Sequence, residues 1–359
     1  MKSFFGQTRQ QIGEYLKQNG ISITHVKPIM KAFYFFAEED SLASTAVPRF
    51  FRARILKDYS FALPEAIRSQ VSNYDGSAKF ELELADGSRI ETVIMPEKNR
   101  ITLCVSSQVG CAQGCVFCYT GKMGLARNLE AHEIVTQIVF ANMWLLRHPD
   151  WLTKLNYTSG TSVSNVVFMG MGEPCDNPSE VAKAIEILTD PWGLSLAPSK
   201  VTVSTAGHLD GLKIIYNKLP QVNYALSLHS TSNGERSRLM PINKRFPIEE
   251  VLQYFRDLSD CNKKNFLIQY TVIDRVNDDE QSAKSLASLV EGIRCKINLI
   301  PLNPIEPSIL NSPLPERLIA FRDELTRQGL RVMIRYSKGQ DIDAACGQLV
   351  ALGTSKTTL

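Results

Sequence analysis

The chain has 359 residues, of which 44% are hydrophobic and 21% are charged, close to the averages of globular proteins. This composition argues against a wholly disordered chain, a coiled coil and a collagen-like repeat, and the length suggests about two domains. The net charge of +3 is uneven, because residues 1–70 hold ten Lys/Arg against six Asp/Glu and the rest hold 30 against 31. A basic start of this size fits a nucleic-acid partner and a merely solvated surface equally well.

The sequence also limits where the protein acts. It contains no run of 18 or more apolar residues, so no transmembrane helix is expected. Its start, MKSFFGQTRQQ, lacks the apolar core and the small-residue cleavage site of a secretory signal. We therefore expect a cytoplasmic protein, in which eight cysteines indicate metal or redox chemistry rather than a disulfide framework.

Residues 1–72 are predicted to form a small N-terminal helical domain. Apolar residues recur at helical spacing in QQIGEYLKQNG, PIMKAFYFFAEED and AVPRFFRARILKDY, and the first of these ends in Asn-Gly, a stop signal. No candidate catalytic cluster lies in this region. We expect it to be an accessory domain.

Residues 73–100 are predicted to form a β-hairpin extension. AKFELEL alternates polar and apolar residues, ADGS is a turn, and RIETVIMP alternates again. The hairpin should extend the sheet of the domain that follows it.

Residues 101–359 repeat a strand–loop–helix pattern that is typical of an α/β fold with parallel strands. The predicted strands are TLCVSS, NVVFMGMG, KVTVSTAG, NYALSLHS, FLIQYTVI, KINLIPLN and RVMIRYS. Helical segments separate them, among them LEAHEIVTQIVFANMWLLR, IEEVLQYFRDLS, SAKSLASLVEGI and PERLIAFRDELTRQG. A barrel and a doubly wound sheet both fit, and in either the chemistry lies at the carboxyl ends of the strands. About six units favour a partial (βα)6-type barrel.

Three cysteines, Cys111, Cys115 and Cys118, lie within eight residues just after the first predicted barrel strand. Thiolates are soft ligands that suit zinc or an iron–sulfur cluster. Structural zinc usually has four ligands, and the nearest further candidates, His132 and Cys175, do not lie at a matching spacing. Three ligands fit better with a [4Fe–4S] cluster that keeps one iron open for a substrate.

The spacing C-x3-C-x2-C, with the aromatic Phe117 directly before the third cysteine, resembles the signature of the radical S-adenosylmethionine (SAM) superfamily. The resemblance implies a [4Fe–4S] cluster whose open iron binds SAM and whose electron cleaves it. Five flanking motifs, CVSSQVGC, GKMGLARNL, FMGMGEP, SLHS and DIDAACGQL, together resemble the RlmN/Cfr family of RNA adenosine methyltransferases. That resemblance covers residues 88–350, with a looser match before them.

Polar residues at the ends of several strands are the candidates for binding SAM. A strand that ends in glycines and Glu173 permits close backbone approach and offers a carboxylate for an ammonium, although a solvated glutamate in a turn is an equal alternative. Ser227 and His229 lie two apart and so share one strand face, where their partner is a ligand or, as the alternative, one another or a buried water. The resemblance implies SAM contacts at Phe117, Gly172, Glu173, Ser204, Ser227, Leu228, His229 and Asn303.

Two further cysteines match no metal spacing, and a lone cysteine is usually a small buried hydrophobe. The resemblance instead implies that Cys346 becomes methylated by one SAM, and that the radical from a second SAM activates this methyl group for addition to adenine. Glu91 is implied as the proton acceptor, with an exposed hairpin residue as the alternative. Cys104 is implied as the resolving cysteine, which forms a transient disulfide with Cys346 and releases the RNA.

The resemblance also implies partners. The RlmN branch methylates carbon 2 of an adenosine in the peptidyl-transferase region of 23S rRNA, and some members modify tRNA, whereas Cfr-type members methylate carbon 8. The residues Val-Ser-Ser-Gln-Val-Gly and Gly-Glu-Pro favour the RlmN branch. We expect a monomer that takes electrons from a flavodoxin-like donor, with residues 1–72 as the RNA-binding domain. Another radical SAM enzyme, such as a glycyl-radical activator, and a non-catalytic metal-bound RNA-binding protein remain alternatives.

Overall fold

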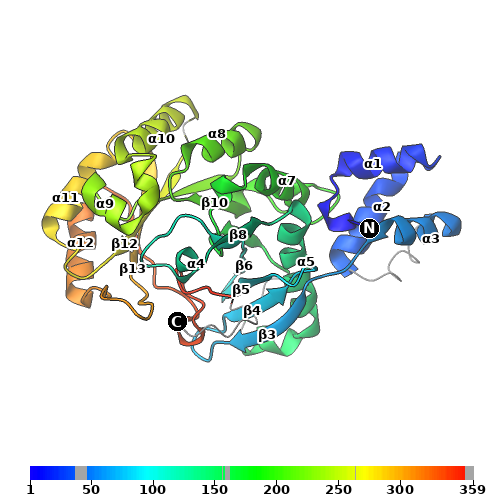
Figure 1. Cartoon of the computed structure of the whole chain (residues 1–359), viewed down its shortest axis with the longest axis horizontal. Helices are drawn as coiled ribbons and strands as arrows, with labels where there is room; N and C mark the ends of the chain where they lie inside the picture. Colours follow the sequence, from blue (N-terminus) through cyan, green and yellow to red (C-terminus); the bar gives the residue numbers. More distant parts are fainter. Residues whose placement is uncertain (37–46, 156, 158–161, 263, 352–359) are drawn as a thin grey trace.

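The computed structural model describes residues 1–36, 47–155, 157, 162–262 and 264–351. Figure 1 shows a helical unit at one end of the molecule and a larger α/β body beside it. A ten-stranded sheet runs through the body in the order β14-β13-β12-β11-β10-β9-β6-β5-β4-β3. No helix among the described residues is long and apolar enough to cross a membrane.

Seven strands at one side of this sheet are parallel. They are β6 (Arg100–Cys104), β9 (Asn165–Phe168), β10 (Val201–Thr205), β11 (Asn223–Ser227), β12 (Phe266–Val272), β13 (Cys295–Pro301) and β14 (Val332–Ile334). All seven coincide with predicted strands, because short runs rich in β-branched residues are typical of buried parallel strands. Within the described residues the strand order does not return on itself, so the barrel is open, as predicted.

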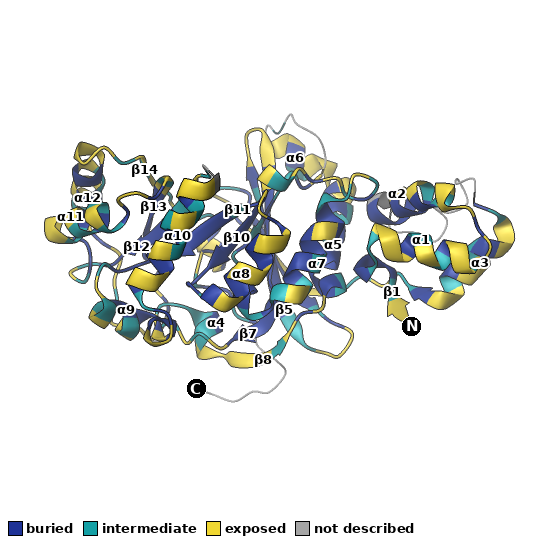
Figure 2. Ribbon diagram, turned by 90° about the horizontal axis from the view of Figure 1, so that it is seen from above, coloured by how far each residue is buried: buried dark blue, intermediate teal, exposed yellow. Residues whose placement is uncertain are grey.

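Helices lie between the parallel strands along the chain, and most of them cover the outer face of the sheet. They are α4 (Tyr119–Lys122), α5 (Ala131–Arg147), α6 (Pro149–Lys154), α7 (Pro178–Thr189), α8 (Leu209–Lys218), α9 (Asn233–Leu239), α10 (Ile248–Asn262), α11 (Glu280–Leu289) and α12 (Pro315–Arg327). Figure 2 shows their buried faces turned toward the strands and their exposed faces turned away, as amphipathic sequences require. Side chains of Ser232 and Asp279 cap α9 and α11 by accepting backbone hydrogen bonds from the first turn.

Short 3₁₀ helices mark the connections. They are η1 (Phe4–Gly6), η2 (Ile23–His25), η4 (Pro174–Asp176), η5 (Pro198–Lys200), η6 (Pro241–Lys244) and η7 (Gln340–Ile342). Two of them lie next to segments discussed below: η4 follows β9, and η7 precedes the segment that carries Cys346.

The antiparallel extension is larger than the predicted hairpin. β4 (Ala78–Glu83) and β5 (Arg89–Glu97) form that hairpin, and β5 pairs with β6. A third strand, β3 (Glu65–Val71), pairs with β4, so the prediction that the helical region reaches residue 72 was wrong for these residues. β3 is an edge strand with six of its seven residues exposed, and it therefore lacks the alternation that reveals a half-buried strand.

The N-terminal unit contains the three predicted helices. It consists of β1 (Lys2–Ser3), α1 (Arg9–Gln18), α2 (Val26–Phe36), α3 (Arg49–Asp58) and β2 (Tyr59–Ser60). The Thr8 side chain begins α1 with a capping box. Phe33 stacks on Phe61 with ring centroids 3.8 Å apart. Arg9 reaches the body, where it pairs with Asp190 at 3.3 Å, so the unit is docked on the barrel.

Candidate active site

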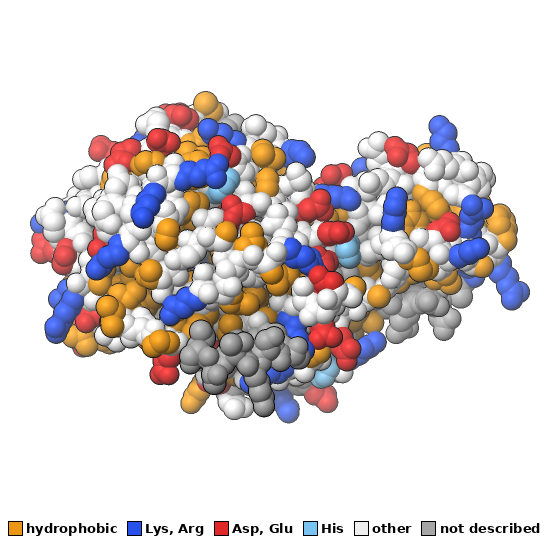
Figure 3. Space-filling view, in the orientation of Figure 1, with side chains coloured by type: hydrophobic (Ala, Val, Ile, Leu, Met, Phe, Trp, Pro, Cys, Tyr) orange, Lys and Arg blue, Asp and Glu red, His pale blue; other side chains and the backbone are white. Residues whose placement is uncertain are grey.

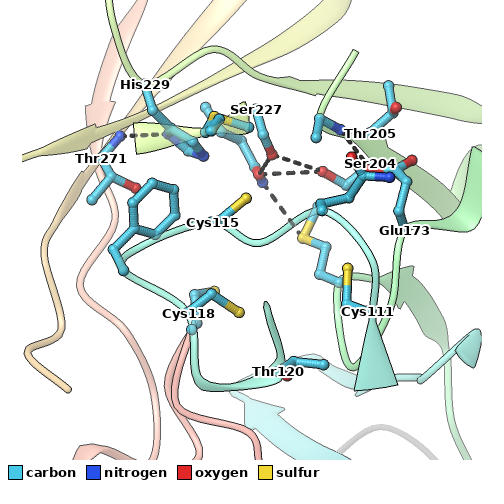
Figure 4. A pocket seen from close by; sticks show the side chains of 18 of the residues that line it. Cys111, Cys115, Cys118, Thr120, Glu173, Ser204, Thr205, Ser227, His229 and Thr271 are labelled. Atoms are coloured by element: carbon cyan, nitrogen blue, oxygen red, sulfur yellow. Dashed lines mark hydrogen bonds between the residues drawn. The ribbon is translucent and has the colours of Figure 1, made fainter. Parts of the chain in front are cut away.

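A cavity lies at the carboxyl ends of the parallel strands, where α/β folds place their ligands. Figure 4 shows side chains converging on it from the cysteine loop and from the ends of several strands. Eleven of the fourteen predicted site residues line it: Cys111, Cys115, Phe117, Cys118, Gly172, Glu173, Ser204, Ser227, His229, Asn303 and Cys346. The structure therefore brings most of the predicted site residues together around one cavity.

The three cysteines of the triplet come from one loop. β7 (Gln108–Cys111) pairs with β8 (Gly124–Asn128) and ends at Cys111, and α4 begins directly after Cys118. Gly110 has a φ of +75°, and a Cβ there would lie 1.9 Å from the carbonyl oxygen of Gly124, so only glycine fits this close approach. The hairpin β7–β8 thus holds the loop against the cavity.

The cysteines of the triplet are shielded from water, Cys111 fully and Cys115 and Cys118 in part. Burial raises the pKa of Cys111 to about 12, and burial with the charges of neighbouring cysteines also raises the pKa values of Cys115 and Cys118. Coordination to iron removes this penalty, because metal-bound thiols are deprotonated. Among the described residues no group of three His, Cys, Asp or Glu side chains could hold a metal ion. Since the thiols instead surround a cavity, they fit a bulkier iron–sulfur cluster.

Arg236 is a buried cation that the sequence did not reveal. Its guanidinium donates to the backbone carbonyls of Leu228, Ala206 and Ser227 at 3.0, 2.6 and 3.1 Å. Burial lowers its pKa to about 10, and the charge of Cys115 opposes this shift. Arg236 therefore joins the ends of β10 and β11 and supplies positive charge beside the cysteine loop.

Glu173 lies where a strand turns sharply into the cavity wall. Its carboxylate accepts backbone hydrogen bonds from Ala206 at 2.7 Å and Cys175 at 3.0 Å. Burial raises its pKa to about 7. The preceding Gly172 has a φ of +101°, and a Cβ there would lie 2.6 Å from that of Gln108. A carboxylate has about four acceptor positions, so Glu173 keeps capacity for an ammonium group in the cavity.

A small polar cluster crosses the cavity floor. The hydroxyls of Ser204 and Ser227 lie 3.5 Å apart, and each contacts the side-chain oxygen of Gln269, at 3.3 and 3.4 Å. Ser204, Ser227 and Gln269 thus satisfy one another, whereas the alternative drawn from the sequence paired Ser227 with His229 or a buried water. The distances are at the long end for O–H donors, so the bonds are weak and stronger partners would displace them. Gln269 interrupts the apolar strand FLIQYTVI, and that signal could have identified it.

His229 closes the cavity beside the cysteine loop. Its Nδ1 accepts a hydrogen bond of 2.9 Å from the backbone N–H of Thr271, and its ring meets Phe117 edge-on at 5.2 Å. Burial lowers its pKa to about 3, so the ring is neutral and carries its proton on Nε2. His229 is therefore a donor toward a ligand. Leu228 does not line the cavity, because its side chain is part of the hydrophobic core.

Cys346 lies at the junction of two cavities. It lines the main cavity, and it also lines a smaller one together with Cys104 and Arg335. The backbone at Cys346 and directly after it is held by two donors. The Asn303 side chain donates to the carbonyl of Cys346 at 3.1 Å, and the N–H of Tyr119 donates to the carbonyl of Gly347 at 2.8 Å. An exposed thiol thus stands between the cysteine triplet and Cys104.

Cys104 is the buried partner of that exposed thiol. Burial raises its pKa to about 12, the charge of Cys346 adds to this, and Arg335 opposes it. Both thiols are free, so the disulfide expected as a transient species is not present. Glu91 lines neither of these two cavities; its carboxylate pairs with Lys79 at 3.1 Å and accepts from the backbone N–H of Val350 at 2.9 Å.

Comparison with known proteins agrees with this geometry. Residues 105–286 match the sequence profile described as the Radical SAM superfamily. A protein of Campylobacter lari named "Dual-specificity RNA methyltransferase RlmN" is 40% identical over 336 residues, which cover 90% of this chain and 91% of that one. A protein of the same name from Campylobacter jejuni is 37% identical over 353 residues, covering 95% of each chain.

The fold also matches a solved structure. A radical SAM methyltransferase from Sphaerobacter thermophilus superimposes with a TM-score of 0.88 at 33% sequence identity, covering 97% of this chain and 99% of the other. The similarity therefore extends over the N-terminal unit, the antiparallel extension and the barrel.

Proposed function

The chain belongs to the radical SAM superfamily and, within it, to the RlmN family of RNA methyltransferases, and from this premise we propose that it methylates carbon 2 of an adenosine in 23S rRNA and in tRNA. Its cofactors are a [4Fe–4S] cluster and SAM. The observation that supports the finer proposal is the position of Cys346, which borders both the cavity of the cysteine triplet and that of Cys104.

We assign the cluster to Cys111, Cys115 and Cys118, the three thiols that border the main cavity. When bound, the cluster supplies the electron that cleaves SAM to methionine and a 5′-deoxyadenosyl radical. We assign the amino group of SAM to Gly172 and Glu173, because a buried carboxylate faces the cavity there. The remaining SAM contacts fall to Phe117, Ser204, Ser227, His229 and Asn303, which line the same cavity, whereas the side chain of Leu228 lies in the core.

Two cysteines carry the methyl group in this proposal. Carbon 2 of adenine is not nucleophilic, so Cys346 as a thiolate first accepts a methyl group from one SAM. The 5′-deoxyadenosyl radical that a second SAM would supply takes a hydrogen atom from this methyl group, and the resulting carbon radical adds to the base. We keep Glu91 as the acceptor of the ring proton, and burial raises its pKa. Because Glu91 pairs with Lys79 and lines neither cavity, the proton reaches it through water rather than by direct contact with the base. Cys104 then attacks the sulfur of Cys346, so the C–S bond breaks, a disulfide forms and methylated RNA leaves. A thiol reductant restores both cysteines, and a flavodoxin-like protein supplies the electron for SAM.

RNA must reach a cavity inside the barrel, and the target base must leave its stack. The N-terminal unit, from β1 to Phe61, is our candidate for holding the RNA. Figure 3 shows Lys and Arg side chains spaced over this lobe. On α3, Arg49, Arg54 and Lys57 are exposed beside Phe50, whose exposed fraction is 70%. A basic helix with an exposed aromatic suits both phosphates and unstacked bases.

A variant with Arg49→Gln, Arg54→Gln and Lys57→Gln tests this assignment. We expect weaker RNA binding with a smaller salt dependence, and unchanged formation of 5′-deoxyadenosine from SAM without RNA. RNA affinity equal to that of the unaltered protein would contradict it. We further propose that the protein is cytoplasmic and that it is a monomer. The native mass of the purified protein tests the second of these proposals directly.

The proposed reaction is tested by anaerobic incubation of the reconstituted protein with reductant and SAM that carries a deuterated methyl group. Unmodified 23S rRNA and bulk tRNA are supplied separately, and digested nucleosides are compared by mass spectrometry with 2-methyl- and 8-methyladenosine. Labelled 2-methyladenosine is expected. Labelled 8-methyladenosine would transfer the protein to the Cfr type, and 5′-deoxyadenosine without any labelled nucleoside would refute the substrate.

A further inference from the structure

A buried ion pair outside both cavities lies against the segment that carries Cys346. Lys79 on β4 and Glu91 on β5 pair at 3.1 Å, and their side chains are only 8% and 6% exposed. In the register of the sheet Lys79 lies opposite Val93, and Val93 lies opposite Cys104. Lys79, Glu91 and Cys104 therefore share one face of the antiparallel extension.

The hydrogen bonds left over by this pair go to the Cys346 segment. The ammonium of Lys79 donates to the carbonyl of Asp343 at 3.1 Å, and the carboxylate of Glu91 accepts from the N–H of Val350 at 2.9 Å. These two backbone groups lie on either side of Cys346. The pair thus binds the segment on both sides of Cys346. Figure 1 shows the segment running beside the extension.

The segment has little regular structure of its own to fix the thiol. After η7 it runs through residues with positive φ, among them Asp343 at 52° and Gly347 at 86°. From the barrel side it is held by Tyr119 and by Thr120, whose hydroxyl donates to the carbonyl of Leu349 at 2.7 Å. From the opposite side Lys79 and Glu91 hold it.

We propose that Lys79 is a positioning residue which, through its pair with Glu91, fixes the Cys346 segment so that the thiol stands between the main cavity and Cys104. The inference rests on the proposed function and adds to it a residue that touches neither reacting sulfur. Burying two charges costs desolvation free energy, and an apolar pair of similar volume is often at least as stable. The buried pair is therefore explained better by the position it gives to the Cys346 segment than by its contribution to stability.

Lys79→Met removes the ammonium and keeps most of the volume, and Lys79→Arg restores a cation. The first readout needs no turnover: amide hydrogen exchange of residues 339–351 in the cluster-loaded protein, together with the rate at which a mild oxidant joins Cys104 and Cys346. The second readout is methylation of Cys346 by SAM, measured as a mass increase of its peptide. The third is 5′-deoxyadenosine formed without RNA, which reports the cluster and SAM site alone.

We expect Lys79→Met to exchange faster in this segment and to slow both disulfide formation and Cys346 methylation on the order of 10- to 100-fold, because a misplacement of about 1 Å can lower a rate about 100-fold. The formation of 5′-deoxyadenosine should stay within about twofold, since the cysteine triplet and the residues assigned to SAM lie outside the Cys346 segment. Lys79→Arg should recover a large part of the lost rates. Unchanged exchange and Cys346 methylation in a folded Lys79→Met protein would overturn the proposal.

Two further variants keep the test decisive. If Lys79→Met leaves an unpaired carboxylate and does not fold, Lys79→Met combined with Glu91→Gln removes both charges, and the same readouts apply. Glu83→Gln is the matched control, because it removes a carboxylate from the same hairpin that pairs with Arg89 instead. A protein that methylates no RNA but shows the expected effects of Lys79→Met would refute the proposed substrate and leave this inference standing.

Discussion

Attack of Cys104 on a derivatised Cys346 should become faster as the pH rises. Burial raises the pKa of Cys104 to about 12, and Arg335 only partly opposes this shift. Only the thiolate attacks, so the rate follows the thiolate fraction of Cys104. With a pKa of about 12, this fraction is on the order of 10⁻⁵ at pH 7 and grows about tenfold per pH unit. The rate should therefore increase about 100-fold between pH 7 and pH 9 and level off only near the pKa.

This step can be observed without RNA. Methyl methanethiosulfonate caps the exposed Cys346 as a methyl disulfide, in cluster-loaded protein that carries Cys261→Ser to remove another exposed thiol. Cys104 then attacks the sulfur of Cys346, a disulfide joins the two residues, and methanethiolate leaves. The loss of the cap is followed by intact-protein mass spectrometry at several pH values.

A rate that is independent of pH from 7 to 9 would refute the reasoning, since it would mean that burial does not control the protonation of Cys104. Cys104→Ala is the control, and it should keep the cap at every pH. Arg335→Met should slow the reaction throughout this range, because it removes the cation that lowers the pKa of Cys104.

Three further outcomes follow from the structure. Cys118→Ser should reduce bound iron and abolish 5′-deoxyadenosine while the far-ultraviolet circular dichroism stays unchanged; full iron content would contradict the cluster assignment. Gly172→Ala should weaken SAM binding in equilibrium dialysis and destabilise the fold by about 1–3 kcal/mol, because φ is +101° and Gln108 blocks a Cβ. Phe33→Ala should destabilise the N-terminal unit by about 3–5 kcal/mol in urea titration, as its stack on Phe61 is lost, with 5′-deoxyadenosine formation without RNA unchanged.

The sequence predicted the barrel well because most of its strands are buried and rich in β-branched residues. Runs such as KVTVSTAG and FLIQYTVI have this composition, and their boundaries coincide closely with β10 and β12. β3 escaped prediction for the opposite reason, since an edge strand with both faces in water has no hydrophobic period to detect.

The sequence indicated most of the residues that line the cavity, but not the residues that hold them in place. His229 was placed on a strand face, yet β11 ends at Ser227 and His229 has a φ of 57°, so a turn, rather than the pleat, aims its ring. Arg236 reads as an exposed helix residue in NGERSRL, and only the folded chain shows the three carbonyls around it. A local pattern cannot report a contact whose partners come from other strands.

Lys79 shows how a distant segment changes the meaning of a local pattern. In AKFELEL it lies on the polar side of a regular alternation, which predicts a solvated face. That face is covered, because the chain leaves β14 at one edge of the open barrel and crosses to the extension at the other. The segment that crosses between the two edges of the open barrel is therefore also the one that carries Cys346. In our proposal, the thiol of Cys346 lies between the cysteine triplet and Cys104 only while the segment is hydrogen-bonded both to the barrel and to the extension. This requirement accounts for the buried charges of Lys79 and Glu91 on the extension.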